Sequence, residues 1–220
     1  MSASASGWVR LDATLEAGGV LLPGDLVVPP GARSMVAFAH GSGSSRRSPR
    51  NVAVAERLHE RGLGTLLFDL LTPDEADDRR NVFDIELLAT RLGAAAAWVR
   101  DRVEAAGLPV AFFGASTGAA AALVAAAAVE EQPIAIVSRG GRPDLAADAL
   151  ELVMAPTLLI VGGRDLEVLA LNREAQRRLS GESRLEVVPG SGHLVEEPGA
   201  LERVAELAAS WISDHLPVAG

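Results

Sequence analysis

Short and nearly uninterrupted apolar runs alternate along most of the chain with longer stretches in which apolar residues recur at helical spacing. The runs predict strands that are buried on both faces, and the stretches between them predict helices. We expect strands at 35–39, 65–70, 110–113, 134–137, 157–161 and 184–188. We expect helices at about 49–61, 84–106, after Ser116, from 166 through about 179, and at 201–215. This order predicts an α/β fold with a mainly parallel sheet and helices on both of its faces.

Two segments depart from this pattern. Residues 8–14 alternate between apolar and polar positions, and Gly24-Asp25 interrupts the apolar run at 20–28, as expected for antiparallel N-terminal strands with one face in water. Residues 71–82 are charged and lack periodicity, so we expect a surface loop there and minimal or no lid. The chain of 220 residues fits a single domain at 8–220, with residues 1–7 expected to be disordered.

Composition narrows the classes of function. The formal net charge of −9 argues against a nucleic-acid partner, because phosphate binding needs a basic face. Cysteine is absent, which excludes disulfides, thiolate zinc sites and a cysteine nucleophile. No cluster has the spacing of metal ligands and no cofactor fingerprint occurs, so we expect neither a metal nor a cofactor.

The expected location is the cytoplasm. The first seven residues lack the basic and apolar segments of a signal peptide. The apolar stretch at 119–129 is shorter than a membrane span, so we expect no membrane partner. The sequence makes no prediction of oligomeric state.

A Gly-x-Ser-x-Gly motif, Gly114 to Gly118, lies between a predicted strand and an alanine-rich predicted helix. This is the sequence form of a nucleophile elbow, in which a sharp strand-to-helix turn exposes the hydroxyl of the central serine, Ser116. The pattern alone is common by chance in a chain rich in Gly and Ser, so its context must support it.

Asp165 and His193 follow two later predicted strands. Ligands of parallel sheets bind beyond the carboxyl ends of the strands, and the chain order Ser-Asp-His is that of an α/β-hydrolase triad. We expect His193 to take the proton of Ser116 and Asp165 to hold the imidazole. Taken singly, Asp165 could instead cap a helix and His193 could be a surface histidine.

The glycine-rich turn from His40 to Ser45 is expected to face the same site. The oxyanion of an acyl transfer needs two backbone N–H groups, which we assign to Thr117 and Ser42. A phosphate-binding loop is the weaker interpretation, because the turn lacks a third glycine and a Gly-Lys-Ser/Thr ending. His40 and Gly41 are candidate substrate contacts, although His40 could instead brace the loop beneath the site.

The remaining polar residues near this edge are mostly arginines: Arg46, Arg47, Arg50, Arg139, Arg142 and Arg164. Arg46 and Arg139 are candidates for binding a substrate carboxylate, since guanidinium pairs with carboxylate in bidentate fashion. The alternative for each arginine is an ion pair with Asp69, Asp84 or Asp144 that braces a loop. The other histidines, His59 and His215, fall in predicted helices, and we expect both to be solvated.

Six segments, 40–51, 83–92, 112–123, 137–146, 155–165 and 190–201, together resemble the α/β-hydrolase superfamily. Within it, the chain is similar to the small, lidless dienelactone-hydrolase-like group, including hydrolase domains fused to phosphoribosyltransferase domains in bacteria. The resemblance implies an esterase or lactonase that works through an acyl-enzyme, with Ser116, Asp165 and His193 as the triad. Dienelactone hydrolases proper use a cysteine nucleophile, so the absence of cysteine favours a serine carboxylesterase.

The leading hypothesis is therefore a serine hydrolase acting on small or short-chain esters or lactones. A thioesterase or acyltransferase would use the same triad. A non-catalytic binding domain is the third hypothesis, because a fold does not by itself imply a function.

Overall fold

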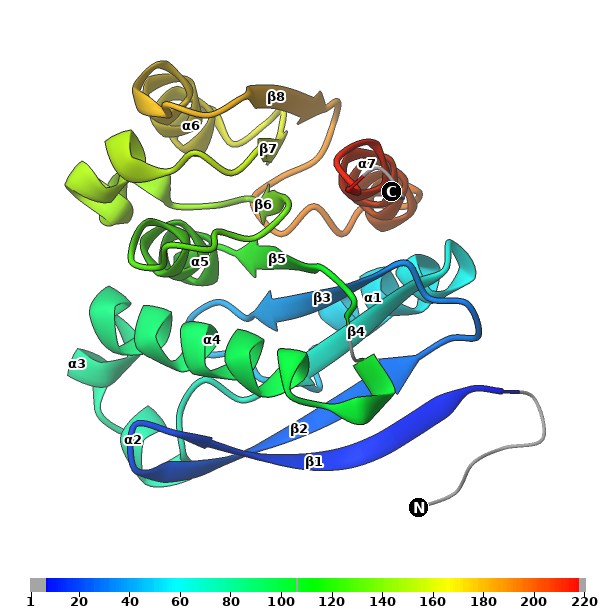
Figure 1. The fold of residues 1–220 in the computed structure, drawn as a ribbon. Helices are drawn as coiled ribbons and strands as arrows, with labels where there is room; N and C mark the ends of the chain where they lie inside the picture. Colours follow the sequence, from blue (N-terminus) through cyan, green and yellow to red (C-terminus); the bar gives the residue numbers. More distant parts are fainter. Residues whose placement is uncertain (1–6, 106, 218–220) are drawn as a thin grey trace.

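A central sheet of eight strands organises the molecule (Figure 1), and the computed structural model describes residues 7–105 and 107–217 of it. The strand order is β1-β2-β4-β3-β5-β6-β7-β8. The strands are β1 (Val9–Ala17), β2 (Val20–Val28), β3 (Ser34–Ala39), β4 (Leu63–Phe68), β5 (Val110–Ala115), β6 (Ile136–Arg139), β7 (Thr157–Gly162) and β8 (Ser183–Val188). Strands β3 to β8 are mutually parallel, whereas β2 pairs antiparallel with both β1 and β4. The predicted α/β fold class, with antiparallel strands at the N-terminus, is confirmed.

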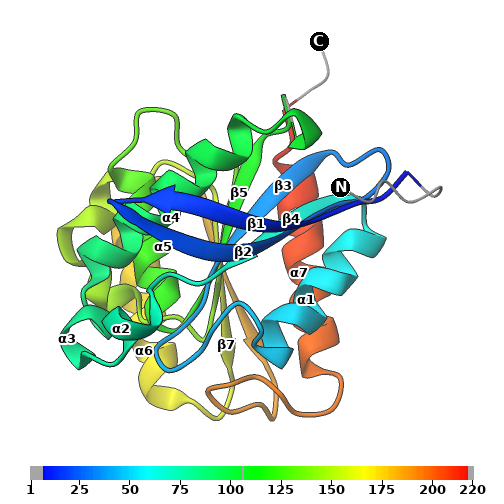
Figure 2. The same cartoon turned by 90° about the horizontal axis from the view of Figure 1, so that it is seen from below.

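Helices cover both faces of the sheet, which gives three layers (Figure 2). The helices are α1 (Pro49–Glu60), α2 (Pro73–Ala76), α3 (Arg79–Val82), α4 (Ile85–Arg100), α5 (Thr117–Ala127), α6 (Leu166–Arg178) and α7 (Ala200–Asp214), with 3₁₀ segments η1 (Val103–Ala105) and η2 (Pro143–Leu152). Helices α1 and α7 pack side by side on one face, and α4, α5 and α6 lie on the other. None of the helices in the described ranges is long and apolar enough to cross a membrane.

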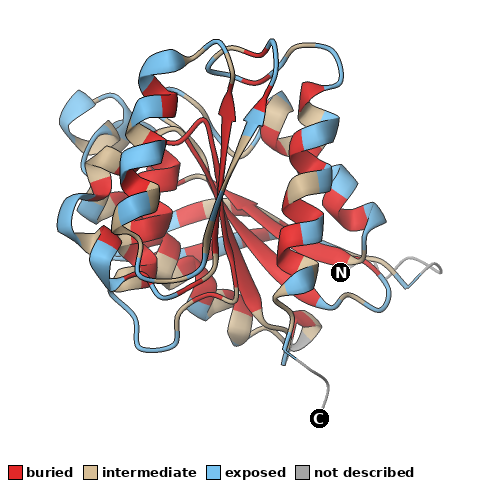
Figure 3. Cartoon of the chain, turned by 90° about the horizontal axis from the view of Figure 1, so that it is seen from above, coloured by how far each residue is buried: buried red, intermediate tan, exposed pale blue. Residues whose placement is uncertain are grey.

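The continuous apolar runs form the inner strands, as their pattern predicts. Every residue of β3, β4, β5, β6 and β7 is buried, and the exposed positions lie on the outer sides of the helices, on the loops and on the outer strands β1, β2 and β8 (Figure 3). Strand β8 lies at the edge of the sheet, and only its last residue is buried. The carboxyl ends of the inner strands are thereby fixed in position by two hydrophobic cores.

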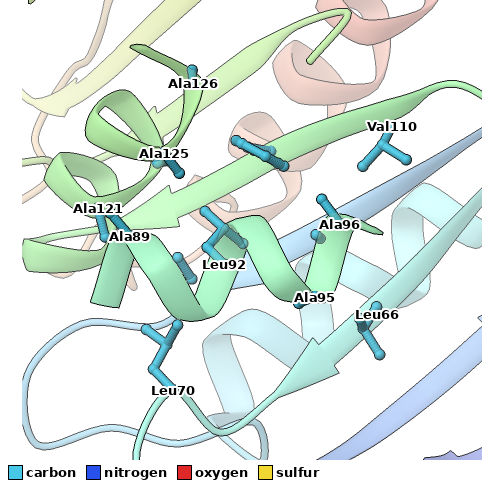
Figure 4. Packing of buried hydrophobic residues seen from close by; sticks show 14 of the residues in the cluster. Leu66, Leu70, Ala89, Leu92, Ala95, Ala96, Val110, Ala121, Ala125 and Ala126 are labelled. Carbon is cyan, nitrogen blue, oxygen red and sulfur yellow. The ribbon is translucent and has the colours of Figure 1, made fainter. Parts of the chain in front are cut away.

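Helix α5 packs on the sheet beside α4, and it is apolar on nearly every side (Figure 4). Ala121 and Ala125 of α5 belong to the same buried cluster as Ala89 and Leu92 of α4. Alanine carries no long side chain, so the helices approach closely while still removing apolar surface from water. This packing holds the N-terminus of α5, and with it the turn that precedes the helix.

The sequence-based prediction was wrong at several boundaries. Strand β2 runs unbroken through Gly24-Asp25, and segment 71–82 contains the short helices α2 and α3 rather than a loop. A capping box formed by Thr72 and Glu75 starts α2, and the Asp78 carboxylate caps α3. Helices this short show no periodicity, so only their capping residues signal them.

Two other boundaries also moved. Helix α4 ends at Arg100, and the kinked segment η2 was not predicted. The prediction of disorder for residues 1–7 falls outside the described residues except at Gly7.

The expectation that His59 and His215 are solvated was wrong. His59 lies on the inner side of α1 and is 8% exposed. Its Nε2 is 2.7 Å from Thr65 Oγ1, and the ring of Trp8 contacts it edge-on. His215, at the end of α7, is half-buried and has its Nδ1 2.7 Å from the carbonyl oxygen of Trp211.

Burial of His59 makes stability dependent on pH. Burial, and secondarily the charge of Arg10, lower the pKa of His59 to about 4 from 6.5. Between these values the unfolded chain binds a proton at His59 that the folded chain does not bind, so the free energy of unfolding falls as the pH drops from about 6.5 to 4. Relative to a His59→Gln variant, the stability of the parent should decrease by on the order of 2 kcal/mol between pH 7.5 and 4.5. Urea unfolding at both pH values measures this change, and a difference that stays constant with pH would contradict it.

Candidate active site

Ser116 occupies the turn between β5 and α5 in a conformation that residues other than glycine rarely adopt. Its φ and ψ are 53° and −120°. Such a conformation costs ~1–3 kcal/mol and persists only where the surroundings impose it. Two hydrogen bonds hold the turn: the Ser116 N–H donates to the carbonyl of Arg139 (3.2 Å), and the Arg142 N–H donates to the carbonyl of Ser116 (3.1 Å). The strand, strained turn and helix therefore form the elbow that the Gly-x-Ser-x-Gly motif predicts.

Gly118 allows this elbow to pack against the neighbouring strand. A Cβ at this position would lie 2.2 Å from the carbonyl oxygen of Ala39, the last residue of β3. Since the contact is with backbone, neither side can yield cheaply. A side chain at 118 would push the N-terminus of α5 away from the turn that follows β3.

His193 and Asp165 form a hydrogen-bonded pair across two loops. His193 Nδ1 is 2.7 Å from Asp165 Oδ2. The second carboxylate oxygen, Oδ1, accepts from the N–H of Val168 (3.3 Å) and caps α6. Asp165 thus both caps α6 and bonds to the imidazole of His193, with one carboxylate oxygen for each contact. The capping bond also holds the carboxylate in position against the imidazole.

The loop that carries His193 is anchored on both sides of the residue. On one side, the loop packs closely against Gly162: a Cβ added at Gly162 would lie 2.1 Å from the carbonyl oxygen of Gly192. On the other side, Val195 is fully buried in the core beneath α7 at a φ of 51°, a rare value for a β-branched residue. Burial of the Val195 side chain offsets this backbone strain and holds the His193 loop against the core.

Glu197 connects the His193 loop to the Asp165 loop, a role that the sequence analysis missed. Its Oε1 accepts from the N–H of Gly192 (2.8 Å) and from Arg164 Nη2 (2.6 Å). The bond from Gly192, further backbone bonding and the bond from Arg164 lower the pKa of Glu197 to about 2. The carboxylate is therefore ionised at neutral pH and holds the His193 loop and the Asp165 loop together. Glu197 follows the strand end by several residues, so no strand-end rule would have singled it out.

Ser116 and His193 line one cleft of about 210 Å³ at the carboxyl edge of the sheet. Gly41, Ser42 and Ser44 form one wall, and Arg50, Arg139 and Gly140 contribute to the rest. The structure thus brings the three predicted triad residues to a single site, in the place where parallel sheets bind ligands.

The glycine-rich turn lies against the elbow. A Cβ at Gly41 would be 3.0 Å from Ser116 Cβ, and the N–H of Ser42 donates to Thr117 Oγ1 (2.9 Å). Ser42 therefore lies beside Ser116, but in this structure its N–H is bonded to a side chain. Thr117 is the first residue of α5, a position at which the backbone N–H has no acceptor within the helix.

His40 bonds to the backbone through both of its ring nitrogens. Nε2 accepts from the N–H of Leu70 (3.0 Å), so the neutral ring carries its proton on Nδ1, which is 3.0 Å from the carbonyl oxygen of Gly41. Burial lowers the pKa of His40, which keeps the ring neutral. This arrangement matches the bracing role more closely than contact with a substrate.

Most of the arginines at this edge are paired with carboxylates. Arg46 binds Asp25 and Asp69, Arg50 binds Glu196, Arg142 binds Asp144, and Arg164 binds Glu197. Arg46 thus braces the turn after β3 and lines a second, mostly apolar cavity rather than the cleft. Among the described residues, the guanidinium of Arg139 has neither an ion pair nor a hydrogen bond.

The second cavity, of about 350 Å³, lies on the other side of the glycine-rich turn. Leu70, Leu71, Val82 and Leu88 line it, and the segment containing α2 and α3 forms its outer wall. The cavity could not be predicted from the sequence, because its outer wall is formed by α2 and α3, which were not predicted.

The parallel sheet, the elbow and the His–Asp pair together define an α/β-hydrolase fold. No protein-family model matches the chain. Two Mycobacterium tuberculosis proteins, each named "Putative phosphoribosyl transferase", are 60% identical over 200 residues, which are 91% of this chain but 45% of each relative. The chain thus spans less than half the length of these curated relatives.

Solved structures give full-length matches. The dienelactone hydrolase of Anabaena variabilis is 52% identical, with a TM-score of 0.92 and coverage of 96% of this chain and 99% of that one. Est1E from Butyrivibrio proteoclasticus is 17% identical, with a TM-score of 0.76 over 92% of this chain and 99% of that chain, which shows a shared fold only. The chain therefore belongs to the dienelactone-hydrolase-like group of the α/β-hydrolase superfamily.

The close contact at Gly118 predicts a large loss of stability on adding one methyl group. Gly118→Ala should lower the free energy of unfolding by about 2 kcal/mol or more, because the new Cβ collides with backbone. Gly93, in α4, is the matched control: a Cβ there meets nothing within 4 Å, so Gly93→Ala should stabilise by about 0.5–1 kcal/mol. Urea denaturation of both variants measures these changes, and a Gly118→Ala protein as stable as the parent would refute the argument.

Proposed function

We propose that this protein is a serine hydrolase that cleaves small or short-chain carboxylic esters or lactones through an acyl-enzyme. One observation carries the proposal: Ser116 stands at a strained strand-to-helix turn in the same cleft as His193, whose Nδ1 is bonded to Asp165. A serine hydroxyl is a weak nucleophile and needs an adjacent base of this kind. The membership in a family of hydrolases supports the same reaction class.

The proposed reaction proceeds in two halves. His193 Nε2 removes the proton of Ser116 Oγ as the oxygen attacks the acyl carbon, and Asp165 stabilises the resulting imidazolium. The tetrahedral intermediate then expels the alcohol, which takes the proton from His193, and leaves an acyl group on Ser116. Water attacks this acyl-enzyme by the same route, with His193 again as base, and releases the acid.

The proposed oxyanion hole is the N–H of Thr117 together with the N–H of Ser42. The Thr117 N–H lies at the N-terminus of α5, where the helix dipole favours negative charge. The Ser42 N–H donates to Thr117 Oγ1 in this structure, so in the reaction it must be shared with, or turned to, the substrate oxygen. The hydroxyl of Thr117 would hold the Ser42 loop in place before substrate arrives.

The space at the site supports small substrates. The cleft of about 210 Å³ and the apolar cavity of about 350 Å³ meet at Gly41, Ser42 and Ser44, so a short acyl or alcohol group could occupy the apolar cavity. Every residue of the proposed site lies in the region shared with the longer M. tuberculosis relatives, whereas their transferase name belongs to proteins of which this chain spans less than half.

The test combines covalent labelling with turnover. An active-site fluorophosphonate should label the parent protein, and p-nitrophenyl acetate and butyrate should be hydrolysed, because an activated serine attacks both reagents. Ser116→Ala should abolish labelling and lower kcat by about 10⁴-fold or more. An unlabelled parent would reject the serine hydrolase, and activity that survives in Ser116→Ala would reject the nucleophile. A thioester of the same acyl group, assayed in parallel, distinguishes esterase from thioesterase activity.

A further inference from the structure

The apolar cavity beside the cleft has the size of a small-molecule site. Its volume of about 350 Å³ falls within the range of ~300–1,000 Å³ typical of such sites, whereas the cleft of about 210 Å³ falls below it. The two spaces meet at Gly41, Ser42 and Ser44. A substrate that reacts at Ser116 therefore needs room beyond the cleft, and the cavity adjoins the cleft with enough space.

The direction of proton transfer assigns one part of the ester to the cavity. In the proposed reaction, His193 gives its proton to the departing alcohol, so the alcohol lies at His193. His193 lines the cleft, whereas Ser42 and Thr117, the proposed donors to the carbonyl oxygen, line the cavity. The acyl group extends from the acyl carbon on the side opposite the alcohol. It therefore points into the cavity, which Leu71 and Val82 line with apolar side chains.

The outer wall of the cavity has little hydrophobic packing of its own. Helices α2 and α3 lie at the outside of the molecule beside α4 (Figure 1), and neither contains a buried residue. Pro73 and Ala76 of α2 and Val82 of α3 face the cavity. Segments with few buried apolar contacts open locally at low free energy unless other contacts hold them. The width of the cavity therefore depends on the polar contacts that attach this wall to the rest of the protein.

Three hydrogen bonds that hold the wall meet at Glu75. Its Oε2 accepts from the N–H of Thr72 (2.9 Å) in the capping box of α2. Its carbonyl oxygen accepts from Asn81 Nδ2 (3.0 Å), which joins α2 to α3. Its Oε1 accepts from Arg91 Nη2 (2.8 Å), which joins both short helices to α4.

Arg91 is a fixed anchor for Glu75. It is 2% exposed, and its Nη1 donates to the carbonyl of Ala17 at the end of β1. It lies one helical turn after Leu88, which lines the cavity from α4. A buried guanidinium is costly without a partner, so Arg91 favours the conformation in which Glu75 pairs with it. The ion pair therefore sets the distance between the α2–α3 wall and Leu88.

We propose that the apolar cavity holds the acyl group of the ester, and that the Glu75–Arg91 ion pair limits the length of this group by fixing the α2–α3 wall. The preferred substrates are then esters of short, unbranched apolar acids. Glu75 and Arg91 are positioning residues, since neither lines the cavity. This inference rests on the proposed ester hydrolase function.

The experiment uses p-nitrophenyl acetate, butyrate and decanoate, which share one leaving group and differ in acyl length. In the parent, kcat/KM should rise about fourfold for each methylene buried between acetate and butyrate, and it should fall for decanoate, which the wall excludes. In Glu75→Ala the wall is released. The ratio of butyrate to acetate should therefore fall, and the ratio of decanoate to butyrate should rise, each by about tenfold.

Two further measurements separate the wall from the cavity. Glu75→Gln keeps the capping box and an acceptor for Arg91, so its ratios should stay close to the parental values. Hydrogen exchange of segment 72–83 should be faster in Glu75→Ala than in the parent and in Glu75→Gln. Val82→Phe fills the cavity from α3, so it should lower the ratio of butyrate to acetate about tenfold without a gain for decanoate.

Glu60→Ala is the matched control. Glu60 belongs to an exposed ion pair of α1, with Arg57 Nη1 at 3.1 Å, and lies outside the cavity. Both ratios should stay at the parental values in this variant. If Glu75→Ala does not fold, Arg91→Lys carries the test of the ion pair. Lysine keeps the charge but cannot bind Ala17 and Glu75 through one fork, so the ratio of decanoate to butyrate should still rise.

The outcomes separate the inference from the proposed function. Parental ratios in Glu75→Ala, or exchange at 72–83 as slow as in the parent, would overturn the role of the ion pair. A parental profile in Val82→Phe would overturn the acyl assignment, and in both cases the esterase remains. If no ester is hydrolysed, the proposed function fails, and binding of the stable amide p-nitrobutyranilide decides the inference. This amide should raise the Tm of the parent more than that of Val82→Phe, and equal rises or no rise would overturn the inference.

Discussion

The site depends on the clamp that holds the strained turn at Ser116. Its N–H donates to the carbonyl of Arg139, the last residue of β6, and its carbonyl accepts from the N–H of Arg142 in the loop that follows. The strain would otherwise relax, since a φ of 53° is unfavourable for serine. The apolar packing of β5, β6 and α5 provides the stability on which these two bonds rely.

The segment from Arg139 to Arg142 both contacts the backbone of Ser116 and lines the cleft. Its backbone constrains the proposed nucleophile, and Arg139, the last residue of β6, lines the cleft with no partner for its guanidinium among the described residues. The conformation of Ser116 and the placement of Arg139 therefore depend on the same short segment, which a hydrogen bond from Asn172 to Gly141 anchors to α6.

The sequence predicted the parts of the structure that repeat locally. Runs such as 110–113 identify buried strands because both faces of an inner strand are apolar, and the motif around Ser116 identifies the turn because few residues tolerate it. The order of strand ends then brings Asp165 and His193 to the same edge. The strands, the turn at Ser116 and the order of the strand ends can therefore all be predicted from local stretches of sequence.

Pairing between distant residues could not be predicted in this way. The sequence gives no reason to distinguish Arg46 from Arg139. Arg46 binds two carboxylates, which come from β2 and from the residue after β4, whereas Arg139 binds no carboxylate among the described residues. The burial of His59 depends on how α1 packs on β4, and the role of Glu197 depends on the meeting of two loops. Each is a property of the assembled tertiary structure.

The buried side chain of Val195 links His193, the proposed catalytic base, to the hydrophobic core. A loop on the surface usually opens locally at a small fraction of the free energy needed to unfold the whole domain. Here the segment that carries His193 cannot open without withdrawing Val195 from the core beneath α7 and exposing it to water. Burial of Val195 therefore opposes local opening of the segment that carries the proposed base, although the imidazole itself faces solvent.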